Sequence, residues 1–328
     1  MNPFTYERPA DAAMALTAFE AAPGAAFLGG GTNLVDLMKL RVAKPERLVD
    51  VAHLSSDRIE LLPEGGVRIG GAVRNSTLAA DRTIRTRYPV LAQALLSGAS
   101  PQLRNLATTA GNLLQRTRCV YFQDASKPCN KRNPGSGCPA IAGYHRTLAI
   151  LGASEACVAT HPSDMAVALV SLDAVVRVRS RAGERAIPLV EFYRLPGDEP
   201  QRDTVLEAGE LITHVELPPL GFAATSRYRK ARDRASYAFA LVSLAAAVDV
   251  ANGVVRDVRL AFGGLAHKPW RALRAETVLR GALPTEEMFR RAADAELADA
   301  KPLAENAFKI PLARNMLVRT LLDLTLAA

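Results

Sequence analysis

The chain has 328 residues and a formal net charge of +8 at pH 7, a length that allows two or three domains. Hydrophobic residues make up 49% and charged residues 23%, the ordinary balance of a soluble globular protein. Aromatic residues make up only 5%, too few for a surface that stacks bases, so the composition argues against a nucleic-acid-binding protein. The dispersed positive charge suits an acidic protein partner equally well.

The first residues and the longest apolar run bear on secretion and membranes. Met1–Arg8 has no basic segment followed by an apolar core, so we expect no signal peptide. The longest apolar run, Ala238–Val248, is too short to span a bilayer. We therefore expect a soluble chain, which a folded partner could still carry into another compartment.

The N-terminal segment predicts a helix, a strand and a glycine turn in succession. The spacing of apolar residues predicts a helix over Asp11–Glu20 and a buried strand over Ala25–Leu28. Gly29-Gly30-Gly31-Thr32-Asn33 follows, and a helix is expected over Leu34–Leu40. A triple glycine leaves backbone N–H groups open to a pyrophosphate, and a side chain at Gly30 would intrude where the phosphate approaches. The glycine spacing differs from G-x-G-x-x-G, which argues against a Rossmann site, and a plain turn is the alternative.

The alternation of strand and helix continues beyond this turn. Strands are predicted over Arg47–Val51 and Gly66–Ile69, and helices over Thr77–Ala80 and Tyr88–Ser97. This alternation indicates an α+β or α/β layered domain. Thr108–Asn112 forms a second polar turn that contains glycine, and the two turns could close on one long ligand from both sides.

The second half of the chain predicts a helix over Met165–Leu172 and strands over Ala174–Arg179 and Glu210–Leu217. Pro218-Pro219 then marks a domain boundary.

A β-hairpin is predicted after that boundary. Val242–Val250 and Val254–Phe262 flank Asn252-Gly253, a pair that tolerates the positive φ of a type I′ turn. The run Ala245–Ala247 leaves a helix as the alternative. From Ala272 onward the pattern is mostly helical. Three prolines are expected to separate the helical pieces: Pro284, Pro302 and Pro311.

All four cysteines of the chain lie between Thr108 and Asp164. They are separated by nine, eight and eighteen residues, which does not fit paired zinc knuckles. Four soft thiolates in a loop rich in turn-forming residues suit a [4Fe–4S] cluster. Two disulfides or four unrelated buried thiols are the alternatives, although a chain of this length needs no disulfide to complete its core. The cysteines are Cys119, Cys129, Cys138 and Cys157.

The residues around the cysteines carry the charge that such a cluster needs. A thiolate-ligated cubane is anionic, and nearby cations would offset that charge. One acid, Asp124, stands among them. The five cations are Arg116, Arg118, Lys127, Lys131 and Arg132.

Several motifs in a fixed order carry a family resemblance. They resemble the FAD-binding medium subunit of the molybdenum hydroxylases, which include xanthine dehydrogenase, carbon monoxide dehydrogenase and aldehyde oxidases. The long cysteine insert resembles that of bacterial periplasmic aldehyde oxidase flavin subunits and, functionally, the [4Fe–4S]-bearing flavin subunit of 4-hydroxybenzoyl-CoA reductase. The motifs are Pro3-Phe4-x-Tyr6-x-Arg8-Pro9, Leu28-Gly29-Gly30-Gly31-Thr32-Asn33-Leu34, Leu48-Val49-Asp50, Ile69-Gly70-Gly71-Ala72 and Arg104-Asn105-x-Ala107-Thr108.

The resemblance implies an α+β fold with two domains. Residues 1–220 would form a two-part FAD-binding domain of the PCMH (vanillyl-alcohol-oxidase-like) type, with subdomains of about 1–56 and 57–220. The cluster-binding insert would occupy about 115–160. Residues 221–328 would form a C-terminal α/β domain like that of the CO dehydrogenase flavoprotein.

The resemblance also implies which residues contact FAD. Two of these residues have an alternative role when the resemblance is set aside. Asp164 could be the N-cap of a helix, and Lys230 could be a solvated surface residue. Ala110 replaces the usual glycine, and a positive φ there would strain an alanine modestly. No catalytic acid–base residue is expected, and the four cysteines are the expected metal ligands. The expected FAD contacts are Phe27, Leu28, Gly29, Gly30, Gly31, Thr32, Asn33, Leu34, Thr108, Ala110, Gly111, Asn112, Asp164, Ile212 and Lys230.

The resemblance implies an electron-transfer subunit of a heterotrimer. A large partner would hold the molybdenum cofactor and oxidise an aldehyde, and a small partner would hold [2Fe–2S] clusters. FAD in this chain would pass electrons to an external acceptor. Export would follow a twin-arginine signal on the small subunit, giving a periplasmic complex; otherwise the complex would be cytoplasmic.

Two other functions remain open at this point. A stand-alone flavin reductase like UDP-N-acetylenolpyruvoylglucosamine reductase shares a similar glycine loop, but its substrate site and catalytic acid are not identifiable here. A non-catalytic iron–sulfur redox sensor that binds acidic partners would leave the glycine turns unexplained.

Overall fold

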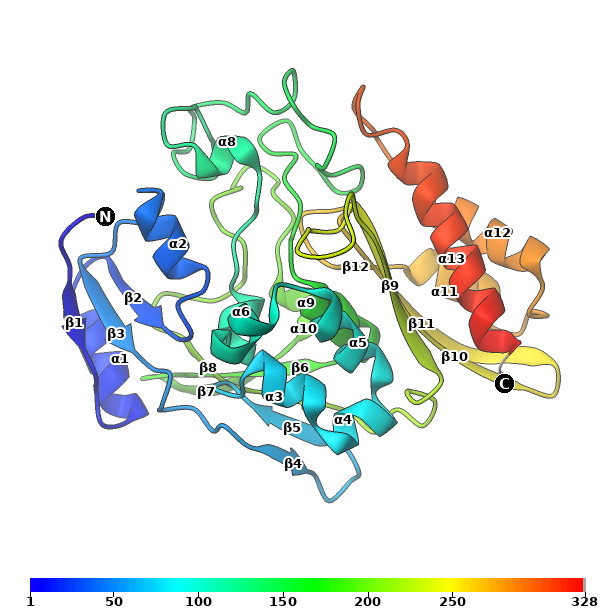
Figure 1. Ribbon diagram of the computed structural model, residues 1–328, viewed down its shortest axis with the longest axis horizontal. Helices are drawn as coiled ribbons and strands as arrows, with labels where there is room; N and C mark the ends of the chain where they lie inside the picture. The colour runs from blue at the N-terminus through cyan, green and yellow to red at the C-terminus, as the bar shows by residue number, and fades with distance from the viewer. Residues whose placement is uncertain (327–328) are drawn as a thin grey trace.

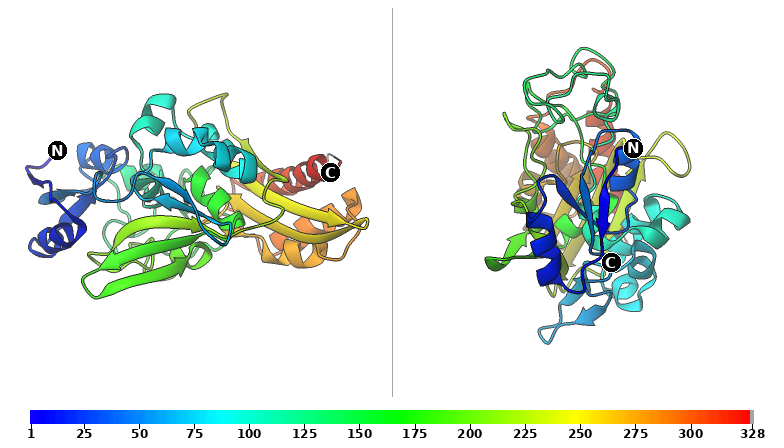
Figure 2. Two further views of the ribbon diagram at one scale, coloured as in Figure 1. Left: turned by 90° about the horizontal axis from the view of Figure 1, so that it is seen from below. Right: turned by 90° about the vertical axis from the view of Figure 1, so that its left-hand side faces the viewer.

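Three β-sheets with helices packed against them make up the molecule, and they follow one another along its long axis (Figure 1). The computed structural model describes residues 1–326, so residues 327 and 328 of the expected C-terminal domain lie outside the described residues. A second direction of view shows the same succession of sheets (Figure 2). This architecture confirms the predicted α+β class.

The N-terminal sheet is small and parallel, with the strand order β1-β3-β2. Asp11 begins the first helix, because its side chain accepts a hydrogen bond from the Met14 N–H at 2.8 Å. Leu16 of that helix and Val49 of the sheet are buried in one apolar cluster. The two predicted strands (β2 and β3) and the two predicted helices (α1 and α2) are present. The elements are β1 (Thr5–Glu7), α1 (Ala12–Glu20), β2 (Ala25–Leu28), α2 (Leu34–Lys39) and β3 (Arg47–Asp50).

The middle sheet is antiparallel, with the strand order β4-β5-β8-β6-β7. Its core contains the paired residues Ile69 and Val215, both fully buried, together with residues of helices α3 to α5 and α9. Almost every side chain of α9 is buried, because this helix lies between the middle sheet and the C-terminal sheet. The elements are β4 (Ile59–Leu61), β5 (Val67–Gly70), α3 (Asn75–Ala80), α4 (Arg82–Arg87), α5 (Pro89–Ser97), α6 (Pro101–Leu106), α9 (Asp164–Ser171), β6 (Val175–Ser180), β7 (Gly183–Pro188), α10 (Leu189–Phe192) and β8 (Leu211–Leu217).

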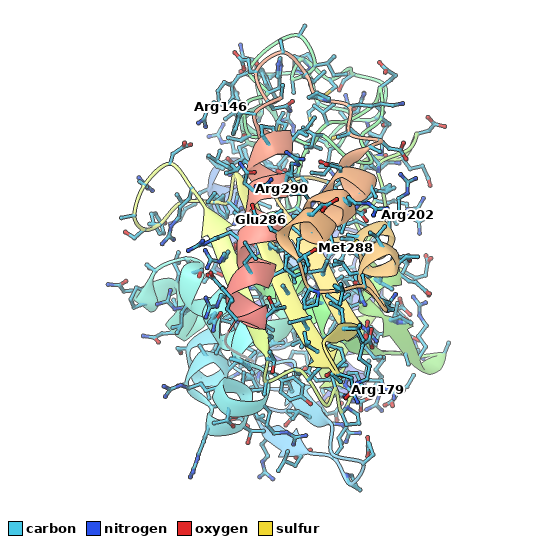
Figure 3. The ribbon with its side chains drawn as sticks, turned by 90° about the vertical axis from the view of Figure 1, so that its right-hand side faces the viewer. Arg146, Arg179, Arg202, Glu286, Met288 and Arg290 are labelled. Atoms are coloured by element: carbon cyan, nitrogen blue, oxygen red, sulfur yellow. The ribbon has the colours of Figure 1, made fainter. Side chains whose placement is uncertain are left out.

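The C-terminal sheet is also antiparallel, with the strand order β12-β11-β10-β9. Helices α12 and α13 lie across its outer face (Figure 3), where Glu286 and Arg290 form an ion pair one turn apart on α12. The elements are β9 (Ser226–Ala231), β10 (Val242–Ala251), β11 (Val254–Gly263), β12 (Trp270–Arg271), α11 (Leu273–Leu279), α12 (Glu286–Leu297) and α13 (Lys309–Thr325).

Strands β10 and β11 form the predicted hairpin, so the helical alternative for Ala245–Ala247 is wrong. Asn252 and Gly253 take positive φ values of 53° and 76° in the turn. The alanines fit a strand that is buried on both faces. Ala245 packs in the core of the middle sheet, whereas Ala246 on the opposite face packs in the core under α11 to α13.

Pro311 does not separate two helical pieces, contrary to the prediction. It lies in the first turn of α13, where a backbone N–H has no partner inside the helix, so proline is tolerated there. None of the helices within residues 1–326 combines the length and the apolar character of a membrane-spanning segment.

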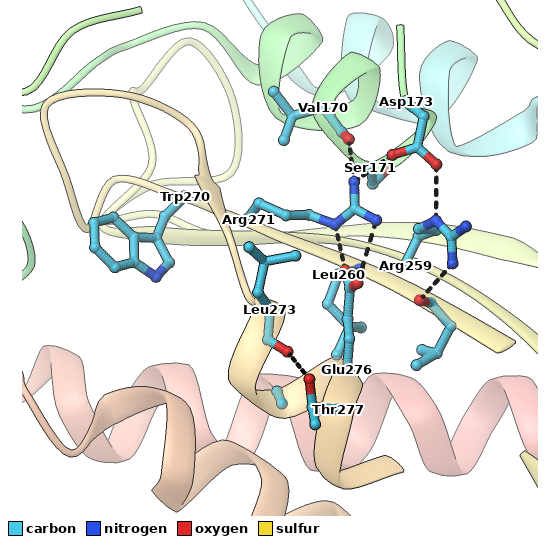
Figure 4. A network of polar contacts seen from close by, with 12 residues as sticks. Val170, Ser171, Asp173, Arg259, Leu260, Trp270, Arg271, Leu273, Glu276 and Thr277 are labelled. Carbon is cyan, nitrogen blue, oxygen red and sulfur yellow. Dashed lines mark hydrogen bonds and ion pairs between the residues drawn. The ribbon is translucent and has the colours of Figure 1, made fainter. Parts of the chain in front are cut away.

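A polar network fixes the C-terminal sheet against α9 (Figure 4). Asp173, just after α9, accepts bonds from Arg259 at 2.8 Å and from Arg271 at 2.6 Å. Arg271 also pairs with Glu276, whose side chain is fully buried. A buried carboxylate is stabilised by such charge-assisted bonds, and they hold one sheet in a fixed position relative to the other.

Lys309 provides a second tie, between α13 and the end of the cysteine insert. Its buried ammonium group donates to the carbonyls of Thr147 and Leu148 at 2.8 Å and of Gly264 at 2.7 Å. Burial lowers the pKa of Lys309 to about 7, whereas the three carbonyl acceptors favour its charged form.

We expect Lys309→Met to lower the free energy of unfolding by about 3 kcal/mol, because three buried carbonyls lose their donor. Lys301→Met is the matched control, since Lys301 is exposed and its side chain makes no such bonds within residues 1–326. Urea unfolding of both variants measures the difference. Equal losses in the two variants would contradict the role assigned to Lys309.

Candidate functional site

The two glycine-containing turns touch each other. A Cβ atom added to Gly30 would lie 1.9 Å from the Leu106 carbonyl oxygen, and one added to Gly29 would lie 2.9 Å from Thr108 Oγ1. Gly31 has a positive φ of 72°, which favours glycine. The glycines therefore serve first to let the two turns approach. The sequence predicted that Gly30 leaves space for a phosphate. In the structure this space is occupied by the Leu106 carbonyl.

The second turn is the start of a helix. Residues Thr109–Leu113 form α7, and Thr108 caps it by accepting a hydrogen bond from the Gly111 N–H at 3.1 Å. Ala110 has helical geometry, so the strain considered for a positive φ is absent at this residue. A threonine followed by a short helical stretch was the available signal for α7. The prediction of a polar, glycine-containing turn over Thr108–Asn112 missed this helix.

Two asparagines hold the turns in place, and one of them keeps a donor free. Asn33 Oδ1 accepts a hydrogen bond from the Arg116 N–H at 2.8 Å, while its buried Nδ2 has no partner within residues 1–326. Asn112 donates to Asn75 at 2.7 Å and accepts from Ser163 at 2.6 Å. A buried N–H group beside the glycine turns fits an oxygen acceptor, such as those of the FAD pyrophosphate or ribityl chain. The residues present therefore fit FAD.

Asp164 and Lys230 form a buried ion pair, with the two charged atoms 2.7 Å apart. The carboxylate also accepts a bond from the Tyr228 hydroxyl at 2.5 Å, and burial together with Asp164 keeps the pKa of Tyr228 well above 10. Ser163, not Asp164, caps α9, since Ser163 Oγ accepts from the Ala166 N–H. The N-cap alternative for Asp164 and the surface alternative for Lys230 are therefore wrong.

The other expected FAD contacts lie on the elements around the turns. The Phe27 ring stacks on the ring of Phe19 in α1, with centroids 4.5 Å apart. Leu34 is the first residue of α2. Leu28 and Thr32 are partly exposed on either side of the three glycines. Ile212 of β8 is 2% exposed and belongs to the middle core.

Gly71 links α7 to β8, a role that the sequence did not reveal. Its carbonyl accepts from the Ala110 N–H at 3.0 Å, and its N–H donates to the Thr213 carbonyl at 2.7 Å. A Cβ atom on Gly71 would lie 2.9 Å from the Ile212 carbonyl oxygen. The glycine pair at the end of a predicted strand was the signal, because such pairs mark close backbone approach.

The four cysteines line one narrow cavity inside the insert. All four thiols are free, three of them are buried, and Cys138 is partly exposed. The only regular element of the insert is α8 (Val120–Gln123), directly after Cys119. Phe122 and Lys131 also line the cavity. The four thiols therefore converge, and the disulfides considered as an alternative are not formed.

The quartet does not stand out as a metal site by its arrangement. Within residues 1–326, no group of three or more His, Cys, Asp or Glu side chains is arranged to hold a metal ion, the four cysteines included. Burial raises the pKa of Cys119, and it raises that of Cys157 to about 12. Ligand thiols must be deprotonated, so a metal group would bind here with release of protons.

The expected cations have different tasks. Arg132 donates to the carbonyls of Tyr121 at 2.9 Å and Phe122 at 2.7 Å, so it braces the insert. Lys131 is almost fully buried and pairs with Asp203, outside the insert. Lys131 lines the cavity of the thiols, as expected of a cation beside them, but Asp203 balances part of its charge and pairs with Arg116 as well.

His161 lies between the insert and α9, and it makes the fold sensitive to acid. Its Nδ1 accepts a hydrogen bond from the Ser163 N–H at 3.3 Å, and burial lowers the pKa of His161 to about 3. The neutral form is favoured in the folded state. Stability is therefore complete above the unfolded pKa of about 6.5 and falls as the pH drops toward 3.

We expect the free energy of unfolding to fall by about 2 kcal/mol between pH 7.5 and pH 5 because of His161 alone. His161→Gln has no group that titrates in this window, so its loss over the same interval is expected to be smaller by that amount. Denaturant unfolding at the two pH values measures both. An identical pH dependence in the two proteins would contradict the buried, neutral His161.

Comparisons with known proteins agree with these features. The model of the FAD binding domain in molybdopterin dehydrogenase matches residues 2–220, and that of the CO dehydrogenase flavoprotein C-terminal domain matches residues 195–324. The chain is 52% identical to the aldehyde oxidoreductase FAD-binding subunit PaoB of Escherichia coli, over 98% of both chains. It is 25% identical to the glyceraldehyde dehydrogenase medium chain of Sulfolobus acidocaldarius, over 92% of this chain and 90% of that one.

Solved structures show the same fold. The chain superposes on reconstituted CO dehydrogenase from Oligotropha carboxidovorans with a TM-score of 0.77 and 22% identity, covering 100% of both chains. The matched family models cover most of the chain, and its glycine turns form a site that fits FAD. The chain therefore belongs to the FAD-binding medium subunits of the molybdenum hydroxylase family of oxidoreductases.

Proposed function

We propose that the chain is the FAD- and [4Fe–4S]-containing electron-transfer subunit of a heterotrimeric, molybdenum-dependent aldehyde oxidoreductase. The observation that carries this proposal is the 52% identity, over nearly the whole length, to the FAD-binding subunit of an aldehyde oxidoreductase. The domain division into residues 1–220 and 221–328 is part of the same proposal.

The FAD would lie along the two glycine turns. The free donor of Asn33 would bind an oxygen of the cofactor, and the buried pair of Asp164 and Lys230 would set the charge nearby. Bound FAD supplies the ability to take up single electrons and deliver a pair. The protein's own task is to hold the cofactor, since no acid–base step is needed from its side chains.

The four cysteines would hold the cluster. A cubane needs four thiolates around one space, and Cys119, Cys129, Cys138 and Cys157 line a single cavity. The insert joins α7 to α9, both of which contribute expected FAD contacts, so the cluster would brace the flavin site.

Two partner subunits complete the proposed complex. A large subunit would hold the molybdenum cofactor, a small subunit would hold [2Fe–2S] clusters, and an external acceptor would take the electrons from FAD. We further propose export of the folded trimer to the periplasm through a signal on the small subunit. Loading of cofactors before export would require folding in the cytoplasm.

Affinity purification of the tagged chain from cells that make all three subunits tests the assembly. We expect the two partners in equal amounts and aldehyde-dependent reduction of a dye by the purified complex. Fractionation of the same cells tests the compartment, with activity expected in the periplasm. A chain that purifies alone and oxidises aldehydes without partners would overturn the subunit assignment, and activity confined to the cytoplasm would overturn export only.

A further inference from the structure

A second cavity lies behind the glycine turns and contains none of the expected FAD contacts. Its volume is about 250 Å³, enough for a small organic molecule. It is formed by the end of α7, the segment before α9 and the long connection from α10 to β8. Its walls are Leu113, Leu114, Gln115, Arg116, His161, Tyr193, Gln201, Arg202, Asp203, Thr204 and Leu206.

Unpartnered polar atoms concentrate on this cavity. Within residues 1–326, nine buried side-chain nitrogen or oxygen atoms have no hydrogen-bond partner, and five of the nine belong to its lining residues Arg116, His161, Gln201 and Asp203. The Arg116 Nε and Asp203 Oδ2 atoms still form an ion pair at 2.5 Å. Arg116 Nη2, His161 Nε2 and Gln201 Oε1 are left, although the Leu113 carbonyl lies close enough to the His161 ring to favour its charged form. Buried polar groups are nearly always paired, so three such atoms at one cavity point to a ligand.

Gln201 Oε1 is an acceptor, and a 180° rotation of this amide would present its NH2 donor to an anion instead. The other two atoms define the ligand. His161 Nδ1 accepts a bond from the Ser163 N–H, so Nε2 carries the ring hydrogen and is a donor. Arg116 Nη2 is a second, charged donor. Two donors from separate side chains match the two oxygens of a carboxylate.

The remaining walls match an apolar body attached to that carboxylate. Leu113, Leu206 and Tyr193 contribute apolar surface, and the Tyr193 hydroxyl is already bonded to the Leu113 carbonyl at 3.0 Å. The one acid among the walls, Asp203, is partly exposed, and its charge does not repel an anion because both Arg116 and Lys131 pair with it. Burial would raise the pKa of Asp203, but its bond to His267 and these two cations outweigh burial and lower it.

The cavity is connected to the FAD turn through Arg116. The backbone N–H of Arg116 donates to Asn33 Oδ1 at 2.8 Å, and Asn33 Nδ2 has no partner beside the glycines within residues 1–326. A ligand that binds the Arg116 guanidinium therefore contacts the residue that anchors the turn. Occupancy of the cavity is expected to change the environment of the flavin.

We propose that this cavity binds a small carboxylate with an apolar body, held by Arg116 and His161. Its natural occupant would be the carboxylic acid formed by the complex, an identification that rests on the proposed aldehyde oxidation. The site itself depends only on the cavity and its unpartnered donors.

Titration of the purified complex with benzoate tests the proposal, with calorimetry and the visible spectrum of the flavin as readouts. We expect saturable binding with a Kd below about 1 mM and a change in the flavin bands. Inorganic phosphate and benzyl alcohol are the comparison probes, because each has only one half of the required chemistry. Weak or no binding of both is expected.

Two variants separate the cavity from other anion sites. Arg116→Gln is expected to weaken benzoate binding at least about tenfold, as loss of a charged donor requires. Leu206→Trp fills the cavity without removing a charge and is expected to have the same effect, so an Arg116 variant that misfolds does not leave the test open. Arg274→Gln is the control, because Arg274 pairs with Asp299, both side chains are exposed, and neither residue lines the cavity.

The outcomes distinguish this proposal from the proposed function. If the complex has its full FAD content but binds no benzoate, the cavity site is wrong and the proposed function stands. The same holds if the Leu206→Trp variant binds benzoate as tightly as the unchanged complex. Phosphate binding as tight as benzoate would also overturn it. A complex that binds benzoate but forms no acid from aldehydes would overturn the proposed function and leave the site standing.

Discussion

Replacement of Gly30 with valine is expected to lower FAD affinity at least about tenfold, with most of the purified protein free of flavin. A Cβ atom at this position would lie 1.9 Å from the Leu106 carbonyl oxygen and 2.7 Å from its carbonyl carbon. The contacted atoms are backbone atoms of Leu106, at the end of α6 just before the second turn, so no side-chain rotation relieves the clash. The two turns must separate, and the FAD site between them loses its shape.

Gly221→Val is the matched control for this variant. Gly221 has an ordinary φ, and a Cβ atom there meets nothing within 4 Å. FAD is measured after acid precipitation, which releases non-covalently bound flavin, and circular dichroism checks that both variants fold. Full FAD content in folded Gly30→Val would contradict the contact between the turns as a requirement for binding.

Separate replacement of each cysteine with serine is expected to remove most of the iron and acid-labile sulfide, which should otherwise approach about four of each per chain. The physical reason is that all four thiols line one cavity and no other cysteine exists to replace a lost ligand. FAD content is expected to fall as well, because the insert connects α7 to α9.

Cys157 is the decisive member of the series. It is 5% exposed within an apolar segment, which also suits an inert thiol. Ser126→Ala serves as the control, since Ser126 is exposed in the same insert and bonds only to Asp124 on the surface. Full iron content and an unchanged EPR spectrum after reduction in Cys157→Ser would exclude it as a ligand.

The parts of the fold that local sequence determines were predictable. The strand Ala25–Leu28 and the hairpin around Asn252-Gly253 follow from short-range patterns, namely a buried apolar run between turn signals and a pair suited to positive φ. Short helices such as α7 were missed, because five residues carry too little periodicity. Pro311 was misjudged because proline ends a helix or begins one, and only its position in the first turn decides which.

The candidate site was predictable only in part, for a related reason. Residue type alone identifies the glycine turns and the cysteines. It does not identify contacts between side chains that are far apart in the sequence. Lys230 is 66 residues from Asp164, and its burial depends on how β9 packs against α5 and α9. Arg116 and His161 come together only when the insert folds back on itself. Neither shows any special spacing in the sequence.

The visible absorption spectrum of the purified chain reports both proposed cofactors in one measurement. We expect flavin bands superimposed on a broad shoulder at roughly 400 nm, where charge transfer from thiolate to iron absorbs. If both the flavin and the cluster are redox-active, a reductant will bleach both absorption features. A colourless protein carrying neither group would contradict the assignment of this chain as a flavin and iron–sulfur subunit, and flavin bands without the shoulder would contradict the cluster.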